Sequence, residues 1–409
     1  MRFAKTKIQA RQQNGPGRLT VGFAATIDCA VLIAAQELGL FRKHGLSVQL
    51  KREVGWATIR EKLLHEELDA AAAHASMLFS IYCGIGVVRR SCLTGLLLGV
   101  NGSAITLSRE LWDMGARDAM SLGKIIREHK CTRTFTFGVV LELSSQNYIL
   151  RKWLTAGQID PDRDVRVMVI PSALVHETFC SGHLDGYCVA EPWNSSAAMD
   201  GSGWVAATTS EIEPGHPEKV LLVLQEFAEK REEEHLLMIV SLIEAGRFCA
   251  SMENRQQLVQ MLAQPQYFDM NKKLLSNSLV GPFDSGRGKR AVKDFVGFDL
   301  FKAGSPTRAQ GKWVFDVVNA NGSNATNPAL RSEIIPKIFR EDIFRKAMEL
   351  LRTGRSKPGP EQASPFFSPR NAQAETAATG MAGKANQSCP TERNDLAATP
   401  LECISSLCS

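Results

Sequence analysis

The feature that most constrains the fold is an alternation of short apolar runs with segments of helical length, which begins at Leu19. A strand is predicted over 19–23, a helix over 30–37 and a second strand over 47–50. A second series is predicted as strand 134–140, helix 147–156, strand 166–170, helix 172–180 and strand 186–189. Because such alternation is typical of parallel βαβ units, the sequence predicts an α/β fold.

The two series share one local pattern. Residues 59–73 and 174–189 each contain a helix, a Leu-Asp pair and a strand of small residues, with the pairs at Leu68-Asp69 and Leu184-Asp185. Two copies of one pattern favour two lobes of similar build. Recurrence by chance, which α/β proteins allow, is the alternative.

The length of the chain sets the number of compact units. A chain of 409 residues is too long for one ordinary core and suits two units and a tail. We expect a disordered arm over 1–18, a first lobe over 19–104, a second lobe over 105–215, a completion of the first lobe with C-terminal helices over 216–354, and a disordered tail over 355–409. Within the last folded part, helices are predicted over 219–230, 235–251, 255–262 and 345–352, with an irregular stretch up to 327.

Composition narrows the class of protein. A net charge of +5 without a nucleic-acid-binding motif gives no reason to expect direct contact with nucleic acid. The first eighteen residues carry five basic side chains and no apolar run of secretory length, and no segment is apolar enough to span a membrane. The ten cysteines are scattered singly, which favours reduced thiols. These features predict a cytoplasmic protein.

Motifs of catalysis are absent from the sequence. It contains no GxxxxGK[ST] loop, no GxSxG elbow, no HExxH and no GxGxxG after a strand. We therefore expect a binding protein and not an enzyme, with no cofactor and no metal.

Two segments have the form of an anion site. A small anion needs several N–H or O–H donors in a pocket that excludes bulk water, and the N-termini of helices supply such donors. Residues 55–58 precede one predicted helix and include Trp56, whose indole offers a flat wall and a donor; residues 144–147 precede another and include Ser145 and Gln146. One segment lies in each predicted lobe, so we expect them to face each other across a cleft. Two capped helices with a packing tryptophan are the alternative.

Three further residues are candidates for ligand binding. Ser103 lies in the segment 101–103, which we interpret as a connection between the lobes, although a plain turn is equally consistent. His74 follows an Ala-rich strand, where a lone histidine is usually a satisfied core residue. Glu191 follows the strand 186–189, at the end where open α/β sheets bind ligands.

An ordered succession of motifs resembles the nitrate- and bicarbonate-binding proteins of ABC transporters. The likeness extends over roughly residues 19 to 350. Its motifs are Gly22-Phe23 with Asp28, then 39–46, 55–60, 101–108, 151–154 with Gly157 and 159–161, 186–194 and 216–221. The resemblance implies a type II periplasmic-binding-protein fold, in which two α/β lobes joined by crossover segments hinge shut on a ligand in the interlobe cleft.

The resemblance also implies part of the site. Trp56 matches the pocket tryptophan of the family, and Pro171 falls near a pocket-lining proline. Ser103 stands where nitrate-binding relatives place Gln, Gln146 where they place His, and Pro214 where a Lys is expected. These departures leave the anion open between nitrate, nitrite, bicarbonate and an organic sulfonate.

Transport members of the family carry an export leader, which this sequence does not show. That departure is similar to the leaderless cytoplasmic nitrate/nitrite sensor, which holds an RNA-binding antiterminator response regulator inactive until the anion binds. We therefore expect a sensor that regulates nitrate assimilation through such a partner. The alternatives are a transport component whose leader lies outside the sequence and, less favoured, an enzyme similar to thiamine-pyrimidine synthases, whose cysteine-cluster motif the sequence lacks.

Overall fold

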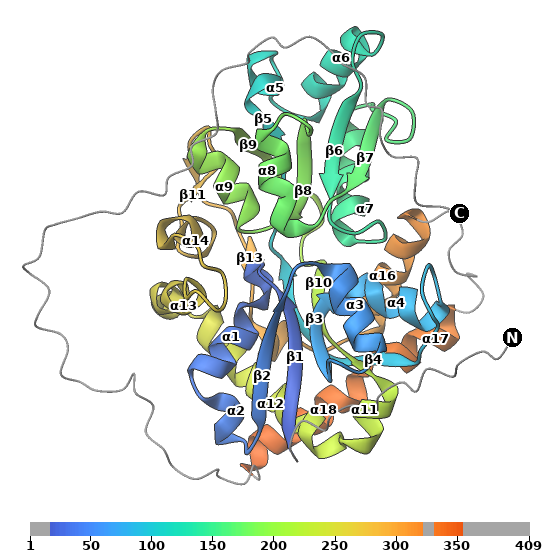
Figure 1. Ribbon diagram of the computed structural model, residues 1–409, viewed down its shortest axis with the longest axis vertical. Helices are drawn as coiled ribbons and strands as arrows, with labels where there is room; N and C mark the ends of the chain where they lie inside the picture. The colour runs from blue at the N-terminus through green and yellow to red at the C-terminus, as the bar shows by residue number, and fades with distance from the viewer. Residues whose placement is uncertain (1–16, 322–330, 355–409) are drawn as a thin grey trace, which may run out of the picture.

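The computed structural model describes residues 17–321 and 331–354, which form two lobes, each built around one mixed β-sheet (Figure 1). The first lobe has the strand order β13-β4-β10-β3-β1-β2, in which β1, β2 and β3 are parallel, and β10 and β13 pair antiparallel with their neighbours. Its strands are β1 (Arg18–Ala24), β2 (Ser47–Glu53), β3 (Ala70–His74), β4 (Cys92–Asn101), β10 (Pro217–Leu224) and β13 (Val296–Gly297).

The second lobe has the order β7-β6-β8-β5-β9, with β6, β7 and β8 parallel and β5 antiparallel to both of its neighbours. Its strands are β5 (Ser103–Ser108), β6 (Phe135–Val139), β7 (Val165–Val169), β8 (Gly186–Ala190) and β9 (Gly203–Thr208). Two sheets of this kind, with helices on their faces, confirm the predicted α/β fold class.

Helices cover both sheets and enclose three apolar cores. Around the first sheet lie η1 (Ile27–Cys29), α1 (Ala30–Glu37), α2 (Leu40–Lys43), α3 (Trp56–Leu64), α4 (Ala75–Cys83), α11 (Gln225–Lys230), α12 (Glu232–Ala250), η3 (Met252–Asn254), α13 (Arg255–Leu262), α15 (Leu300–Ala303), α16 (Arg308–Asn321), α17 (Arg331–Ile338) and α18 (Glu341–Thr353). The second lobe carries α5 (Arg109–Asp113), α6 (Ala119–His129), α7 (Ser145–Ala156), η2 (Ser172–Leu174), α8 (Val175–Cys180), α9 (Trp193–Asp200) and α10 (Thr209–Ile212), and α14 (Lys272–Leu279) with β11 (Phe283–Asp284) and β12 (Lys289–Arg290) packs beside α9.

The chain passes from one sheet to the other at Gly102, between β4 and β5. Gly102 has φ of +89°, a left-handed conformation that suits glycine. Asn101 ties this passage to the returning segment, because its side-chain oxygen accepts from the N–H of Gly215 at 2.9 Å and its own N–H donates to the carbonyl of His216 at 3.2 Å. The two connections therefore run side by side and form the hinge region.

The predicted helix over 219–230 is wrong in its first half. Residues Pro217–Leu224 form β10, a buried strand between β3 and β4, and a helix starts only at Gln225. The run Val220-Leu221-Leu222-Val223 is buried on both faces of the sheet, so it lacks the alternation that distinguishes an exposed-face strand from a buried helix.

Two other predictions concern irregular or disordered segments. The stretch up to 327 contains α14, β11, β12, β13, α15 and α16, so it is more regular than predicted. The disorder predicted for 1–18 and 355–409 falls on residues outside those described, except that Gly17 and Arg18 are described and Arg18 begins β1.

Within the described ranges, no single helix is both long and apolar enough to cross a membrane; α12 meets that criterion only when joined across an 87° bend to Met252–Leu262.

Close packing of α6 on the end of α7 generates a stability prediction. A methyl group on Gly157 would lie 2.6 Å from the carbonyl carbon of Ala119 on α6, which is a steric overlap. We expect Gly157→Ala to lower the free energy of unfolding by about 1–3 kcal/mol, measured by urea denaturation. The control is Gly55→Ala, where the added methyl meets nothing nearer than Pro171 Cβ at 3.9 Å. Equal stability of both variants would contradict the packing argument.

Candidate functional site

The carboxyl group of Glu218 lies between the two lobes and is fully buried. Glu218 belongs to β10 of the first lobe, whereas two of its donors stand at the N-terminus of α7 in the second. Ser145 Oγ donates to Glu218 Oε2, and Gln146 Nε2 donates to Oε1 at 3.0 Å. The start of α7 is fixed by Ser144, whose side chain accepts from the N–H of Asn147. One carboxylate therefore joins a strand of one lobe to a helix end of the other.

The first lobe adds positive and imidazole groups around the same carboxylate. Lys219 Nζ lies 2.9 Å from Glu218 Oε1 and 2.7 Å from Asp28 Oδ2 of η1. His74 Nδ1 lies 3.3 Å from Oε1, and His216 Nε2 lies 3.4 Å from Oε2. We call Asp28, His74, His216, Glu218 and Lys219, with Ser145 and Gln146, the Glu218 cluster.

An irregularity in β10 explains how two adjacent residues reach one cluster. Neighbouring side chains of a regular strand point to opposite faces of the sheet. The pairing of β10 with β4 shifts register between Pro217 and Lys219 and again between Lys219 and Val220. Such bulges redirect side chains locally, so Glu218 and Lys219 can act together.

Trp56 forms one wall beside the cluster. Its ring centre lies 4.9 Å from Lys219 Nζ and 4.4 Å from the ring of His74. The indole Nε1 is buried and has no hydrogen-bond partner among the described residues. Trp56 begins α3, and the N-cap residue, Gly55, has no side chain to cap the first amides. This helix end therefore presents donors that no side-chain cap satisfies.

The structure brings five of the seven predicted ligand-binding residues together. Trp56, His74, Ser103, Ser145 and Gln146 are each at most 5% exposed, and Gln146 Nε2 donates to Ser103 Oγ at 2.9 Å. Their role in ligand binding stays a prediction, but their convergence makes the region where the starts of α3 and α7 approach the Glu218 cluster the candidate site.

The other two predicted ligand-binding residues, Pro171 and Glu191, do not join these five. Pro171 is exposed and faces Gly55 across the lobes. Glu191 is buried, and its side chain accepts from Ser195 Oγ at 2.6 Å, while its carbonyl accepts from the N–H of Ile27 in the first lobe at 2.8 Å. Burial raises the pKa of Glu191 to about 7, against the opposing hydrogen bonds from Ser195. Glu191 thus contacts α9 through its side chain and the other lobe through its backbone.

Burial and charge set the ionisation of the cluster. Burial opposes ionisation of Glu218, but Lys219 and the hydrogen bonds of His216 and His74 outweigh it and hold the pKa of Glu218 well below 4.5. Burial also opposes the charge of Lys219, yet Asp28 and Glu218 raise its pKa. The pKa of His74 is lowered by burial and by Lys219. At neutral pH the cluster therefore contains an ionised Glu218, a charged Lys219 and a neutral His74.

Four residues of the cluster were not predicted as site residues, although each stands in a motif that carries the family resemblance: Asp28, His216, Glu218 and Lys219. The expected loss of a lysine at Pro214 is offset in the structure by Lys219, whose ammonium is part of the cluster. A usable signal was present: three ionisable residues stand at the head of the apolar run that forms β10.

Comparison with known proteins gives a family match and several relatives. Residues 12–263 match the model of the NMT1-like family. The nitrate import ATP-binding protein NrtC of Synechocystis sp. is 34% identical over 337 residues, which cover 81% of this chain and 50% of that protein. The chain spans about half the length of the first curated relatives it matches.

Two further relatives are matched over more of their length. The nitrate/nitrite binding protein NrtA of Synechocystis sp. is 25% identical over 83% of this chain and 78% of its own, and the bicarbonate-binding protein CmpA of Synechococcus elongatus is 25% identical over 81% and 78%. The crystal structure of periplasmic NrtA from Synechocystis superposes with a TM-score of 0.77 at 22% identity, covering 82% of this chain and 89% of that one. This likeness confirms the predicted periplasmic-binding-protein fold.

The depressed pKa of Glu218 gives a prediction for acid stability. Its folded-state value lies below the ordinary 4.5, so its contribution is complete above that pH and is lost as the pH falls through the folded value. Glu218→Gln removes this pH-dependent contribution to the unfolding free energy. Between pH 5 and pH 3 we expect the unfolding free energy of the wild type to fall more steeply than that of the variant, by up to about 1.4 kcal/mol per pH unit.

Glu253→Gln, at an exposed glutamate, is the matched control and should keep the wild-type slope. His74 also lowers the unfolding free energy as the pH falls below 6.5, because its pKa is lower in the folded chain and the unfolded chain takes up that proton first. This part of the decline should persist in Glu218→Gln. Equal slopes for the wild type and Glu218→Gln would show that Glu218 is not held ionised by its neighbours.

Proposed function

The chain belongs to the NMT1-like family, and we propose that it is a binding protein, not an enzyme, that closes its lobes around a small planar oxyanion, nitrate or nitrite. The observation that carries this proposal is the environment of Glu218. Its carboxylate is a planar oxyanion, and it accepts from Ser145 and Gln146 of one lobe while pairing with Lys219 of the other. Donors arranged for one such group suit another of the same shape and charge.

The wall formed by Trp56 supports an anion of small size. Its unpartnered indole N–H and the uncapped first turn of α3 add donors without adding a full charge. Nitrate has one delocalised charge over three oxygens, so several neutral donors satisfy it better than one strong cation. Bicarbonate shares this planar form, and a sulfonate requires more room for its tetrahedral head.

Entry of a ligand requires the lobes to separate. The donors are at most 5% exposed, and contacts such as Ile27 N–H to the Glu191 carbonyl close the lobes around them. The hinge at Asn101 and Gly102 is the place where backbone rotation can open the cleft. A ligand that bridges α3 and α7 favours the closed form, because it adds contacts that the open form cannot make.

The binding proposal predicts a selective response to anions. In calorimetric titration and thermal melting of the full chain, nitrate or nitrite should bind and raise the melting temperature, whereas chloride and sulfate should not. Trp56→Phe keeps an aromatic wall but deletes the indole N–H, so we expect the dissociation constant to rise about tenfold or more. Trp153→Phe, at a core tryptophan of α7, is the control and should bind as the wild type does.

The outcomes are separable. No response to any planar oxyanion would overturn the binding proposal. A response to bicarbonate alone would reassign the ligand within the same class, and an unchanged affinity in Trp56→Phe would remove the indole from the site.

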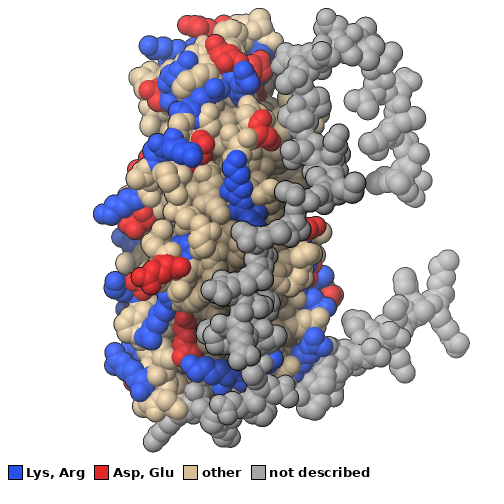
Figure 2. Space-filling model, turned by 90° about the vertical axis from the view of Figure 1, so that its left-hand side faces the viewer, with Lys and Arg blue, Asp and Glu red and all other residues tan. Residues whose placement is uncertain are grey.

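We propose further that the chain acts in the cytoplasm as an anion sensor, regulating nitrate assimilation through an RNA-binding antiterminator response regulator that it holds until the anion binds. The resemblance of the sequence motifs to those of the cytoplasmic nitrate/nitrite sensor supports this role. On the face shown in Figure 2, the basic and acidic side chains of the described residues are interspersed. A transport component is the second candidate, favoured by relatives named for nitrate import and bicarbonate binding.

The partner distinguishes these two roles. The tagged full chain, captured from lysate of its own organism, should retain a response regulator without nitrate and release it when nitrate is added, because the anion and the partner favour different lobe arrangements. The Trp56→Phe variant should need correspondingly more nitrate for release. Co-capture of transporter membrane subunits instead, with no such regulator, would support the transport role and exclude the sensor.

A further inference from the structure

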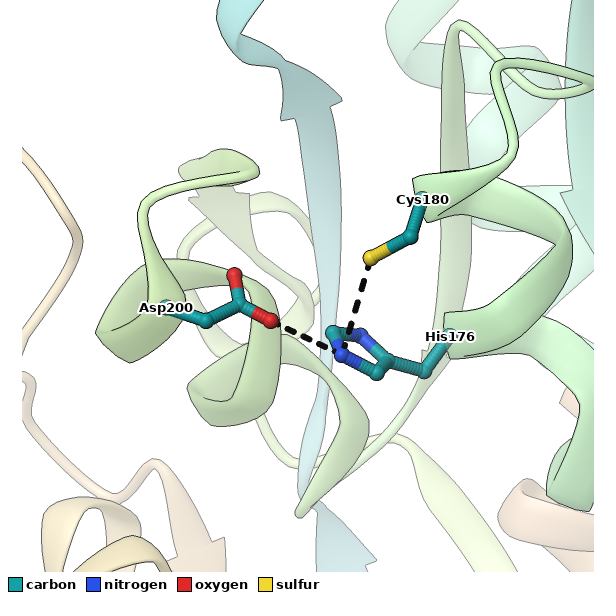
Figure 3. A group of neighbouring side chains, drawn as sticks. All are labelled: His176, Cys180 and Asp200. Carbon is teal, nitrogen blue, oxygen red and sulfur yellow. Dashed lines mark hydrogen bonds and ion pairs between the residues drawn. The ribbon is translucent and has the colours of Figure 1, made fainter. Parts of the chain in front are cut away.

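Three side chains with metal-ligating atoms converge on the second lobe, outside the Glu218 cluster (Figure 3). His176 and Cys180 lie four residues apart on α8, so they share one face of that helix. Asp200 is the last residue of α9. One ligand atom from each residue lies within 4.8 Å of the other two.

The separations are close to those of a metal-bound set. His176 Nε2 lies 3.7 Å from Cys180 Sγ and 2.8 Å from Asp200 Oδ2. Tetrahedral zinc, with bonds of about 2.0–2.3 Å, places nitrogen and sulfur about 3.6 Å apart and nitrogen and oxygen about 3.4 Å apart. The histidine and cysteine therefore already stand at about the required spacing, and the carboxylate oxygen must retreat from the histidine by about half an ångström. Cys180 Sγ and the Asp200 oxygen lie within 4.8 Å of each other.

Both helices hold these side chains in place. The N–H of Ser202 donates to Asp200 Oδ1 at 2.9 Å, which leaves Oδ2 to face His176. Between the two ligands of α8, Phe179 packs edge-on against Tyr187 at 4.9 Å, and the hydroxyl of Tyr187 donates to the carbonyl of Trp193 in α9 at 2.8 Å. The same aromatic contact thus fixes α8 relative to α9.

The arrangement differs from a nucleophilic Cys-His-Asp triad. In such a triad the acid orients one ring nitrogen of the histidine while the nucleophile faces the other. Here Asp200 and Cys180 both face Nε2 of His176. Convergence of all three residues on one point is the geometry of ligands around an ion.

Access to solvent also suits a cation. The side chains of His176 and Asp200 are 26% and 25% exposed, so solvent reaches the point between them. A nitrogen, a sulfur and a carboxylate oxygen form the mixed ligand set that zinc accepts.

We propose that His176, Cys180 and Asp200 bind a divalent transition metal ion of the zinc class, with a fourth coordination position taken by water or by a ligand from outside the chain. This site is independent of the anion proposal, since none of its residues belongs to the Glu218 cluster. A surface ion pair between His176 and Asp200, with Cys180 as a bystander, is the competing explanation.

The test uses the full chain with Cys389, Cys403 and Cys408 replaced by serine, so that these three thiols do not compete for the metal. Titration with Zn²⁺ in a calorimeter should show one ion per chain. Titration with Co²⁺ should give a thiolate-to-metal charge-transfer band. It should also give visible absorption bands with the intensity that is typical of four-coordinate Co²⁺. Cys180→Ser should abolish the charge-transfer band, and His176→Ala should weaken Zn²⁺ binding about tenfold or more.

The control variant carries His65→Ala and Cys131→Ser, an exposed histidine and an exposed cysteine outside the three-residue site. It should bind both metals as the parent does, and circular dichroism should show that each variant is folded. Retention of the charge-transfer band in Cys180→Ser, an equal Zn²⁺ affinity in His176→Ala, or absence of binding by the parent would each overturn the proposal.

Discussion

The closed arrangement of the lobes depends on a carboxylate, Glu218, that is buried between them. An ionised group removed from water is costly unless charges and hydrogen bonds replace its hydration. β10 supplies both Glu218 and its counter-ion Lys219, and Lys219 also pairs with Asp28 of η1. The charged pair is therefore assembled within the first lobe, and the donors of α7 complete it only when the second lobe closes. Closure of the lobes and completion of the hydrogen bonds to Glu218 therefore occur together.

Much of the fold follows from local periodicity. The strands β1, β2, β6, β7 and β8 alternate with helices in sequence, and this alternation predicted them. β10 was missed because Val220 to Val223 are buried on both faces, so the run carries no period, and only pairing with β3 and β4 decides its conformation. The two-residue strands β11, β12 and β13 are too short to leave a periodic signal, since they exist through their partners.

Prediction of the candidate site succeeded where local structure positions a donor. The starts of α3 and α7 are recognisable from Gly55 and Ser144, and they bring Trp56 and Gln146 to the lobe interface. The partners of these residues could not be predicted in the same way. Asp28 and Lys219 are 191 positions apart in the sequence, and their 2.7 Å contact exists only after η1, β3 and β10 have packed. Substitution of an expected lysine by Pro214 therefore said little about the charge of the site.

The presence of Glu218 limits how an anion can be held. Lys219 is already shared by two carboxyl groups, so a second oxyanion placed beside an ionised Glu218 would be repelled in a medium of low dielectric constant. An entering ligand must therefore reach Ser145 and Gln146 while the lobes are open and take the place of Glu218 there when they close. The net binding free energy is then the difference between the contacts of the ligand and those that Glu218 gives up, which is smaller than the contribution of the ligand contacts alone. Under the proposed function, this competition lowers the affinity for the anion below what the same donors would give without Glu218.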